Sequence, residues 1–492
     1  MLEKLDLRKK VAKEDYNRAM EELGERLGKA QRLARDAKKP MIIVFEGWRG
    51  ARRSALINEM MQQMDARGFN VYSSVRISKE AHEQPFFAFF WKHLPAYGHI
   101  AVYHRSWYYL KNAYEVQGSS KHCPGLDISY THINNFEKML TDDGYLILKF
   151  FLHLSPEQQK KNIAKNVKTL GKAWRDLNPA IDESGAYDKY YSRYEKMLEA
   201  TNTVNAPWHL IAADDERSAR LEVFTTLVEA VENALHAPQA EPAATVSTAK
   251  TYDVLSKIDA NKDLSKEEYK EKLEKYQKKL KQLQIEMFKA QIPVVIGFEG
   301  WDAAGKGGAI RRLTAALDPL GFHVHPVSAP NVVEKAFHYQ WRFWINLPQP
   351  GNITIFDRTW YGRVMVERIE GFAKPQEWQR AYDEIKDMEA QWAEHGVAIA
   401  KFWLQIDKDE QLRRFNDRQN DPNKQWKITD EDWRNRDKWS AYEEAVNEML
   451  VRTDTSYAPW TVVEGNNKYY ARLKVLKTVI DLFESKLAQK TE

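Results

Sequence analysis

Residues 294–310 read VVIGFEGWDAAGKGGAI, a short apolar run followed by a glycine-rich loop. The run predicts a buried strand, and Gly300 to Lys306 fits the spacing G-x-x-x-x-G-K between a strand and a helix. The glycines allow a tight turn whose N–H groups point inward, and the helix N-terminus and Lys306 add positive charge. The stretch therefore predicts a cradle for phosphate oxygens; the alternative is a glycine-rich turn that only joins strand to helix. The candidate phosphate-binding residues of the loop are Gly300, Ala303, Ala304, Gly305, Lys306, Gly307 and Gly308.

Two acidic residues accompany this loop. Gly307 stands where such loops usually carry the Ser or Thr that binds magnesium, and Asp302 is the obvious replacement. Asp357 follows the apolar run Ile353–Phe356, which places a second carboxylate at a strand end. Because Mg²⁺ prefers one or two carboxylates with phosphate oxygens and waters, Asp302 and Asp357 are predicted to bind Mg²⁺, or Mn²⁺ in its place. Arg358 could reach the transferring group. The candidate catalytic residues are Asp302, Lys306, Asp357 and Arg358.

A basic helical segment lies farther along the chain. Arg414 and Arg418 are four residues apart and so share a helix face, which makes them candidate phosphate ligands. Residues 420–423 (NDPN) end that helix, and residues 429–432 (TDED) begin another with a capping-box pattern. Two helices joined by a turn predict a lid over the phosphates. On charge alone, a solvated helix pair is the favoured alternative, because acidic residues interleave with the basic ones.

The chain contains two copies of one domain. Phe45–Trp48 recurs 253 residues later as Phe298–Trp301, and residues 105–108 (RSWY) recur as 358–361 (RTWY). Near the ends of the halves the offset is 252, where APW at 206–208 matches APW at 458–460. Residues 236–250 are rich in Ala and Pro and read as a linker. The predicted domains are therefore 1–235 and 251–492.

Each half alternates apolar runs with helical segments. In the second half the runs are 294–298, 353–356, 397–402 and 461–463. Strands alternating with helices predict an α/β fold with a parallel sheet covered by helices on both faces. Ligands of such sheets bind at the carboxyl ends of the strands, where the residues above are found.

The first half lacks the chemistry of the second. Opposite Asp302, Gly305 and Lys306 it carries Arg49, Arg52 and Arg53, and opposite Asp357 it carries His104. Residues expected to pack are kept, namely Trp48, Trp107, Tyr108, Pro207 and Trp208. The first half is therefore predicted to fold alike without catalysing, and its arginines leave open a role as an anion platform.

Composition excludes several classes of protein. The 492 residues are 43% hydrophobic and 29% charged, which argues against global disorder. The single cysteine, Cys123, excludes an internal disulfide and a Cys-based zinc site. A net charge of +4 excludes a basic nucleic-acid coat. No apolar run approaches the ~20 residues of a membrane span. We therefore expect a cytoplasmic protein with no nucleic-acid or membrane partner.

The motifs resemble those of one known family. Gly300–Gly308, residues 341–343 (WRF), residues 356–364 (FDRTWYGRV) and Glu367 together resemble polyphosphate kinase 2, over the whole second half and in degenerate form over the first. The duplicated layout is similar to that of the fused two-domain members. The resemblance implies two tandem P-loop kinase domains of the thymidylate-kinase type with a helical lid. It also implies Mg²⁺-dependent transfer of the terminal phosphoryl group of inorganic polyphosphate to AMP, giving ADP. It further implies nucleotide contacts from Arg342, Arg363 and Glu367, and a phosphate contact from Arg418.

Other functions stay open at this point. They are a polyphosphate-dependent ADP or GDP kinase, an ATP-dependent nucleotide kinase of the thymidylate-kinase type, and a non-catalytic polyphosphate-binding scaffold. Two fused halves could imitate a dimer, and whole chains could pair again as a homodimer.

Overall fold

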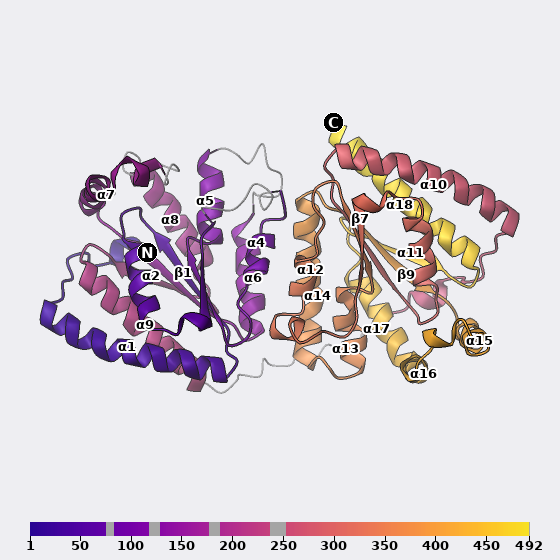
Figure 1. Ribbon diagram of the computed structural model, residues 1–492, viewed down its shortest axis with the longest axis horizontal. Helices are drawn as coiled ribbons and strands as arrows, with labels where there is room; N and C mark the ends of the chain where they lie inside the picture. Colours follow the sequence, from indigo (N-terminus) through magenta and orange to yellow (C-terminus); the bar gives the residue numbers. More distant parts are fainter. Residues whose placement is uncertain (75–82, 118–127, 177–186, 237–251, 492) are drawn as a thin grey trace. The chain divides into compact units, whose positions relative to one another are not determined.

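The computed structural model describes residues 1–74, 83–117, 128–176, 187–236 and 252–491. The chain forms two compact units, and apart from two short segments these are Met1–Ala240 and Glu241–Glu492 (Figure 1). The last helix of the first unit ends at His236, the first residue of the predicted linker. The rest of that linker lies outside the described residues.

The first unit is an alternation of strands and helices. Its strands are β1 (Met41–Gly47), β2 (Phe69–Tyr72), β3 (Ile100–His104), β4 (Leu146–His153) and β5 (Trp208–Ala212). Its helices are α1 (Lys13–Asp36), α2 (Arg53–Gln62), α4 (Ala88–Lys92), α5 (Trp107–Gln117), α6 (Tyr130–Asp142), α7 (Pro156–Asp176), α8 (Tyr187–Thr201) and α9 (Glu216–His236).

The second unit repeats that alternation. Its strands are β6 (Val294–Gly300), β7 (Phe322–Pro326), β8 (Ile353–Asp357), β9 (Ala398–Gln405) and β10 (Trp460–Glu464). Its helices are α10 (Lys266–Lys289), α11 (Lys306–Thr314), α12 (Trp341–Trp344), α13 (Val366–Ile369), α14 (Pro375–Glu394), α15 (Lys408–Gln419), α16 (Asp430–Asp437), α17 (Trp439–Arg452) and α18 (Lys468–Thr491).

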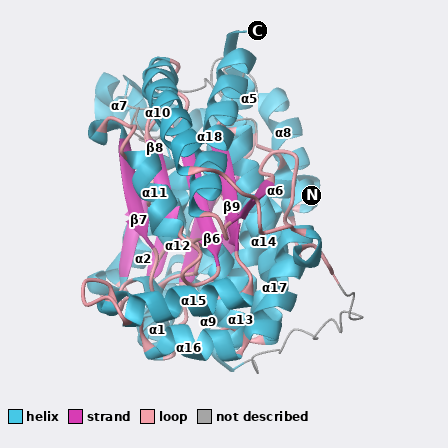
Figure 2. Ribbon diagram, turned by 90° about the vertical axis from the view of Figure 1, so that its right-hand side faces the viewer, coloured by secondary structure: helices cyan, strands magenta, loops and turns pink. Residues whose placement is uncertain are grey.

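Both sheets are parallel and have the same strand order. The order is β2-β3-β1-β4-β5 in the first unit and β7-β8-β6-β9-β10 in the second. The central strands are buried along almost their whole length, as in sheets covered on both faces, and Figure 2 shows the strands enclosed by helices. This confirms the predicted α/β class. Strand β7 was not predicted, because its sequence FHVHP is half polar and it lies at an edge of the sheet.

The helix that opens the second unit, α10, begins at a capped N-terminus. The hydroxyl of Ser265 accepts a hydrogen bond from the N–H of Glu268, whose side chain reaches back to Ser265, which completes a capping box. Helices α10 and α18 lie side by side (Figures 1 and 2). They form one helical layer over the sheet.

A buried ion pair recurs in both cores. Lys401 Nζ lies 2.8 Å from Glu389 Oε2 and donates to the hydroxyl of Tyr361 (2.8 Å) and the carbonyl of Thr453 (2.9 Å). The first half repeats the whole set with Lys149, Glu137, Tyr108 and Thr201. Burial lowers the pKa of Lys401, and the charge of Glu389 opposes that shift. The pair is completely satisfied, as buried charges must be.

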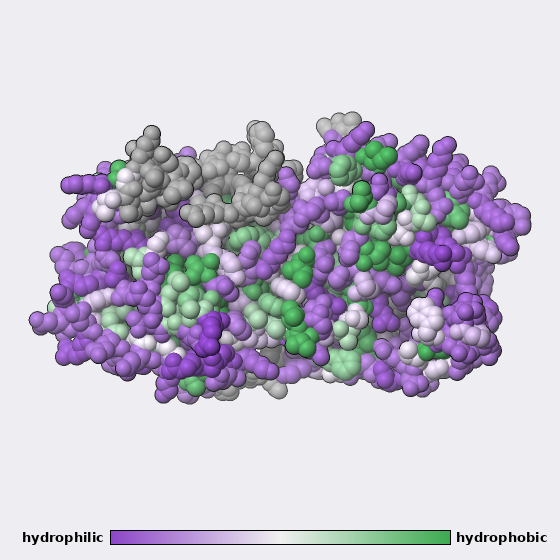
Figure 3. Space-filling model, viewed as in Figure 1, coloured by the Kyte–Doolittle hydropathy of each residue, from purple (hydrophilic) through white to green (hydrophobic). Residues whose placement is uncertain are grey.

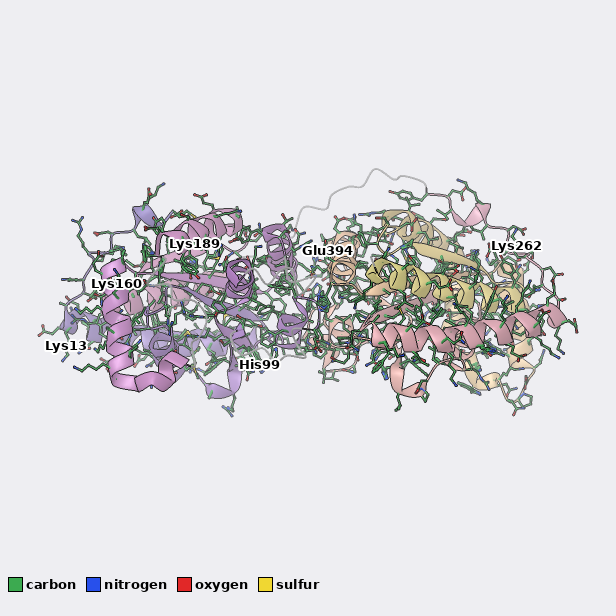
Figure 4. The ribbon with its side chains drawn as sticks, turned by 90° about the horizontal axis from the view of Figure 1, so that it is seen from above. Lys13, His99, Lys160, Lys189, Lys262 and Glu394 are labelled. Carbon is green, nitrogen blue, oxygen red and sulfur yellow. The ribbon has the colours of Figure 1, made fainter. Side chains whose placement is uncertain are left out.

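The surface follows the expected division of polarity. Hydrophilic residues cover much of the face in Figure 3, and the lysines labelled in Figure 4 (Lys13, Lys160, Lys189 and Lys262) are exposed. Of the residues expected to pack in the first half, the aromatic ones are buried but Pro207 is exposed. Among the described residues, no helix combines the length and apolar character that a membrane crossing requires.

Candidate active site

A glycine loop joins β6 to α11 in the second unit. Gly300 has φ +149°, and a Cβ there would lie 2.6 Å from the carbonyl oxygen of Leu404, so only glycine fits. Gly305 has φ +109° and directly precedes the first residue of α11, Lys306. The Lys306 ammonium donates to the carbonyl of Gly300 at 2.7 Å. The structure thus places the predicted loop residues in one tight turn at the carboxyl end of the central strand.

A cavity opens above this loop. Asp302, Lys306 and Arg358 line it from the loop and the end of β8, and Gln411 and Asn435 line it from α15 and α16. Three of the four candidate catalytic residues therefore share one cavity. Helices α15 and α16 form its far wall, which is the position expected of a lid.

The Asp302 side chain is held at this wall. Its Oδ1 lies 3.3 Å from Arg358 Nη2, and its Oδ2 accepts a hydrogen bond of 2.9 Å from the amide of Asn435. Gln411 donates to its backbone carbonyl at 3.1 Å. The lid helix α16 therefore holds the carboxylate of Asp302, and α15 holds its backbone.

Asp357 ends the neighbouring strand. It lies opposite Phe298 in the pairing of β8 with β6, and it is not among the residues that line the cavity. Burial lowers the pKa of Arg358, but the charges of Asp302, Glu299, Glu431 and Asp357 outweigh it and raise that pKa. Both carboxylates thus act on one guanidinium group. We call Asp302 and Asp357 the carboxylate pair.

The carboxylate pair has the donor chemistry of a magnesium site. The described residues contain no group of three or more His, Cys, Asp or Glu side chains close enough to hold a metal ion. Two carboxylates suit an ion that also takes phosphate oxygens and waters, and Mg²⁺ binding by Asp302 and Asp357 stays a prediction. A carboxylate has about four acceptor sites, so the bonds to Asp302 leave room for a metal ion.

The residues predicted to contact the nucleotide are not among those that line the cavity. Arg363 pairs with Glu367 at 2.8 Å and lies over the ring of Tyr339, 5.0 Å from its centre. Arg342 is buried in α12, and its Nη1 donates to the carbonyl of Ser328 at 3.0 Å. The cavity is lined by other residues of the segment after β8, among them Gly362. The nucleotide role of Arg342, Arg363 and Glu367 stays a prediction.

Arg414 is placed differently from the prediction. Its side chain is buried beneath the glycine loop, where Nη1 donates to the carbonyls of Ala303 and Ala304, both at 2.9 Å. Its Nη2 donates to Gly465 (2.6 Å) and Asn466 (3.1 Å), and its Nε donates to Glu410 (2.5 Å). All five N–H groups are used, so none is left for phosphate. Arg414 is a loop anchor instead, because the helix face that carries it packs against the loop.

Arg418, one turn farther along the same helix, bonds within the lid. It is half-buried, and its Nη1 donates to the carbonyl of Lys427 within the lid at 3.0 Å. It does not line the cavity. Its phosphate role stays a prediction.

An aromatic stack joins the loop to the lid. The ring of Trp301 lies parallel to that of Trp439, with centres 3.7 Å apart and planes 8° apart. Trp439 begins α17, directly after the lid helix α16. The sequence reasoning missed Trp439, Asn435 and Gln411, which lie more than 100 residues from the loop and belong to no motif.

The first unit anchors its loop in another way. Arg52 occupies the place of Gly305 with φ +56°, and its guanidinium group pairs with Glu216 of α9. Asn162 occupies the place of Arg414; its amide donates to the carbonyl of Gly50 at 3.0 Å and accepts from Gln158 at 2.9 Å. A cavity of about 200 Å³ remains there, lined by Arg52, Asn162 and Glu216 among others. The arginine that anchors the loop therefore belongs to the lid segment in the second unit and to the loop itself in the first.

Comparisons with known proteins agree with this duplicated architecture. The family model described as polyphosphate kinase 2 matches residues 10–239 and again residues 263–491. A polyphosphate:AMP phosphotransferase of Pseudomonas aeruginosa is 41% identical, with 99% of each chain covered. Another from Pseudomonas syringae pv. tomato is 38% identical, again with 99% of each chain covered. A crystal structure of a polyphosphate kinase 2 protein from Pseudomonas aeruginosa matches with a TM-score of 0.88 and 38% identity, covering 99% of this chain and 100% of that one.

Proposed function

The chain belongs to the polyphosphate kinase 2 family over both of its halves, and from this membership we propose that it is a polyphosphate:AMP phosphotransferase. The second half moves the terminal phosphoryl group of inorganic polyphosphate to the phosphate of AMP. The products are ADP and a polyphosphate chain one unit shorter. The names of the full-length relatives support this substrate pair.

The observation that carries the proposal is one cavity in the second unit. Asp302, Lys306 and Arg358 meet there at the end of a glycine loop with the conformation of a phosphate cradle. The first unit keeps the same sheet but carries Arg49, Arg53 and Arg105 at these positions. A protein that only binds phosphate would not need to retain a complete set of catalytic residues in one of its halves.

The residues of the second half act mainly by positioning and by neutralising charge. Phosphoryl transfer passes through a loose transition state, so little covalent chemistry is required of the protein. The N–H groups of the loop and Lys306 hold phosphate oxygens of the donor. Arg358 lies at the cavity wall, where it can stabilise the charge that develops on the transferring group. The lid helices exclude water and keep the acceptor in line.

The carboxylate pair would hold Mg²⁺. A bound magnesium ion supplies neutralisation of phosphate charge and a template for the phosphate oxygens. Asn435 and Arg358 keep Asp302 oriented for that task. Asp357 supplies the second carboxylate from the neighbouring strand.

The test is nucleotide conversion without ATP. Purified protein is given polyphosphate, Mg²⁺ and either AMP, ADP or GMP, and products are separated by chromatography. We expect ADP from AMP, and loss of that product in Lys306→Ala. Conversion only with ATP as donor would favour a nucleotide kinase, and binding without turnover under any donor would favour a scaffold. A cytoplasmic location and a homodimer stay predictions.

A further inference from the structure

A second cavity of the first unit lies at the edge of the sheet where the strands begin. Its volume is about 250 Å³, and its walls are the end of α1 and the turns that precede β2 and β3. Because the strands are parallel, this edge is opposite to the one that carries the loop after β1. We call it the basic cavity, after the four basic residues that line it, Arg32, Arg35, Arg67 and His99.

The frame of the basic cavity is common to both units. The side chain of Gln31 donates to the carbonyl of Asp65 at 2.9 Å and accepts from its N–H at 2.7 Å. Gln284 and Asp318 make the same two bonds in the second unit, at 3.2 and 2.7 Å. The backbone around the cavity is therefore a property of the fold.

The side chains on that frame differ between the units. At the offset of 253 residues, the four basic residues correspond to Ile285, Phe288, Leu320 and Asn352. The first unit thus has three arginines and a histidine where the second unit has three apolar residues and an amide. All four differences fall on one cavity, so they change its charge while its frame is kept.

The arginines of the basic cavity are only partly neutralised. Arg67 pairs with Asp65 at 2.7 Å, and Arg35 pairs with Asp36 at 3.2 Å. Asp36 does not line the cavity, and among the described residues no carboxylate lies within ion-pair distance of Arg32. Hydrogen bonds from Arg67 and the charge of Arg35 lower the pKa of Asp65. Three guanidinium groups therefore share one carboxylate in the cavity.

This chemistry suits a ligand with several negative charges. Guanidinium groups form charge-assisted and often paired hydrogen bonds to phosphate oxygens. A cavity lined mainly by one sign of charge concentrates ions of the opposite sign. His99, labelled in Figure 4, is exposed and adds a ring nitrogen. Among the described residues that line the cavity it has the only ring, so a nucleobase would have little surface to stack on.

We propose that the basic cavity binds an inorganic phosphate chain through Arg32, Arg35 and Arg67. The choice of a phosphate chain rests on the proposed function, in which polyphosphate is the donor. Each unit of such a chain carries negative charge, so one chain can engage several guanidinium groups at once. The site holds the chain without transferring its phosphoryl group, since the described lining has neither a phosphate loop nor a pair of carboxylates.

The experiment is isothermal titration calorimetry of the full chain with tripolyphosphate, in EDTA and without a nucleotide, where transfer cannot occur. Lys306→Ala is the background, so that binding by the second-unit loop is weakened. We expect Arg32→Ala with Arg35→Ala to weaken the remaining binding about tenfold or more, because two charged donors are lost. Alanine is a good helix former, so α1 should keep its structure.

The matched control is Arg8→Ala with Arg18→Ala. It removes the same charge from two exposed arginines of the same unit that do not line the cavity. It should change the affinity less than about threefold.

Arg67→Leu provides a second cavity variant. The second unit carries Leu320 at this place and forms the same turn, so the substitution should fold. It should also weaken tripolyphosphate binding about tenfold.

Chemical modification locates the ligand in the wild-type chain. Phenylglyoxal modifies exposed arginines, and mass spectrometry then reads each arginine separately. Tripolyphosphate should slow the modification of Arg32, Arg35 and Arg67 but leave that of Arg8 and Arg18 unchanged. This readout does not depend on what the second unit binds.

The outcomes separate the possibilities. Binding that survives Lys306→Ala and falls in the cavity variants but not in the control pair would support the proposal. Equal affinity of the cavity and control variants, with wild-type circular dichroism spectra, would overturn it, as would cavity arginines left unprotected at saturating tripolyphosphate. Inorganic phosphate or AMP bound as tightly as tripolyphosphate would overturn the assignment to a chain, and so would an oligonucleotide bound more tightly. Failure of the transfer assay would leave all of these results unaffected.

Discussion

Replacing Arg414 by Met tests whether this buried arginine anchors the phosphate loop or binds phosphate. Methionine keeps an apolar stem of similar length but removes all five N–H donors. Four of them bind backbone carbonyls, two on the loop and two after β10. The fifth binds Glu410, which keeps its two bonds to Arg413. The lost carbonyl bonds therefore dominate the cost.

The magnitude follows from these bonds. A hydrogen bond contributes about 1 kcal/mol net, and somewhat more when the donor is charged. Loss of four bonds therefore destabilises the second unit by about 4 kcal/mol. Water that enters the site can hydrogen-bond to some of the freed carbonyls, which reduces the net destabilisation to about 3 kcal/mol. For a domain of this size each kcal/mol lowers Tm by about 2–4 °C, so the second unit should melt about 6–12 °C earlier.

Differential scanning calorimetry of the full chain provides the measurement, and Arg413→Met provides the control. Arg413 is the neighbouring residue and shares Glu410, but it is exposed, so its loss should shift Tm by less than about 3 °C. Arg414→Met should also lower kcat, because the loop loosens. Equal melting of the two variants would refute the anchor. An increased KM for polyphosphate at unchanged Tm would indicate a phosphate ligand instead.

Three further predictions concern the site and the core. Asp357→Asn should abolish ADP formation with an unchanged circular dichroism spectrum, because the amide cannot supply the second carboxylate; an active variant would disprove that role. Asn435→Ala should raise the Mg²⁺ concentration for half-maximal rate about tenfold, since Asp302 loses a bond of 2.9 Å. Weaker Mn²⁺ binding by electron paramagnetic resonance should accompany it, and unchanged Mg²⁺ dependence would show that the amide does not position the carboxylate. Lys401→Met should destabilise the second unit by about 3–5 kcal/mol in urea unfolding, because Glu389 is left buried without its partner. A loss below about 1 kcal/mol would contradict this account.

The fold was predictable because its signals are local. Apolar runs of the central strands and the repeat of Phe45–Trp48 as Phe298–Trp301 are visible in the sequence, and the buried strands β1 and β6 carry them. Edge strand β7 has two histidines and partial exposure, so it lacks the apolar run by which the others were found. The exposed Pro207 shows that a retained residue need not be a packed one.

The site was predictable only as far as its motif extends. Residues 300–308 are identified by spacing, since a tight turn restricts which residues fit. The contacts of a helical side chain are not given by spacing: Arg414 is buried under the loop, while Arg418 is half-buried and bonds to Lys427 in the lid. One signal could have identified the anchor: the first half changes Gly305 to Arg52 and Arg414 to Asn162 together. Asn435 is an ordinary amide, and only the tertiary fold brings it to Asp302.

The exchange of anchors between the halves bears on how a duplicated copy loses its activity. A Cβ at Gly305 would lie 3.9 Å from Nη1 of Arg414, in van der Waals contact, so a long side chain at the first position would start next to an arginine at the second. Removing Arg52 alone would leave the first loop without either anchor, and adding an arginine at Asn162 alone would crowd two guanidinium groups. Recovering the anchor of the second unit therefore requires both positions to change together, so one substitution does not restore the loop of an inactivated copy.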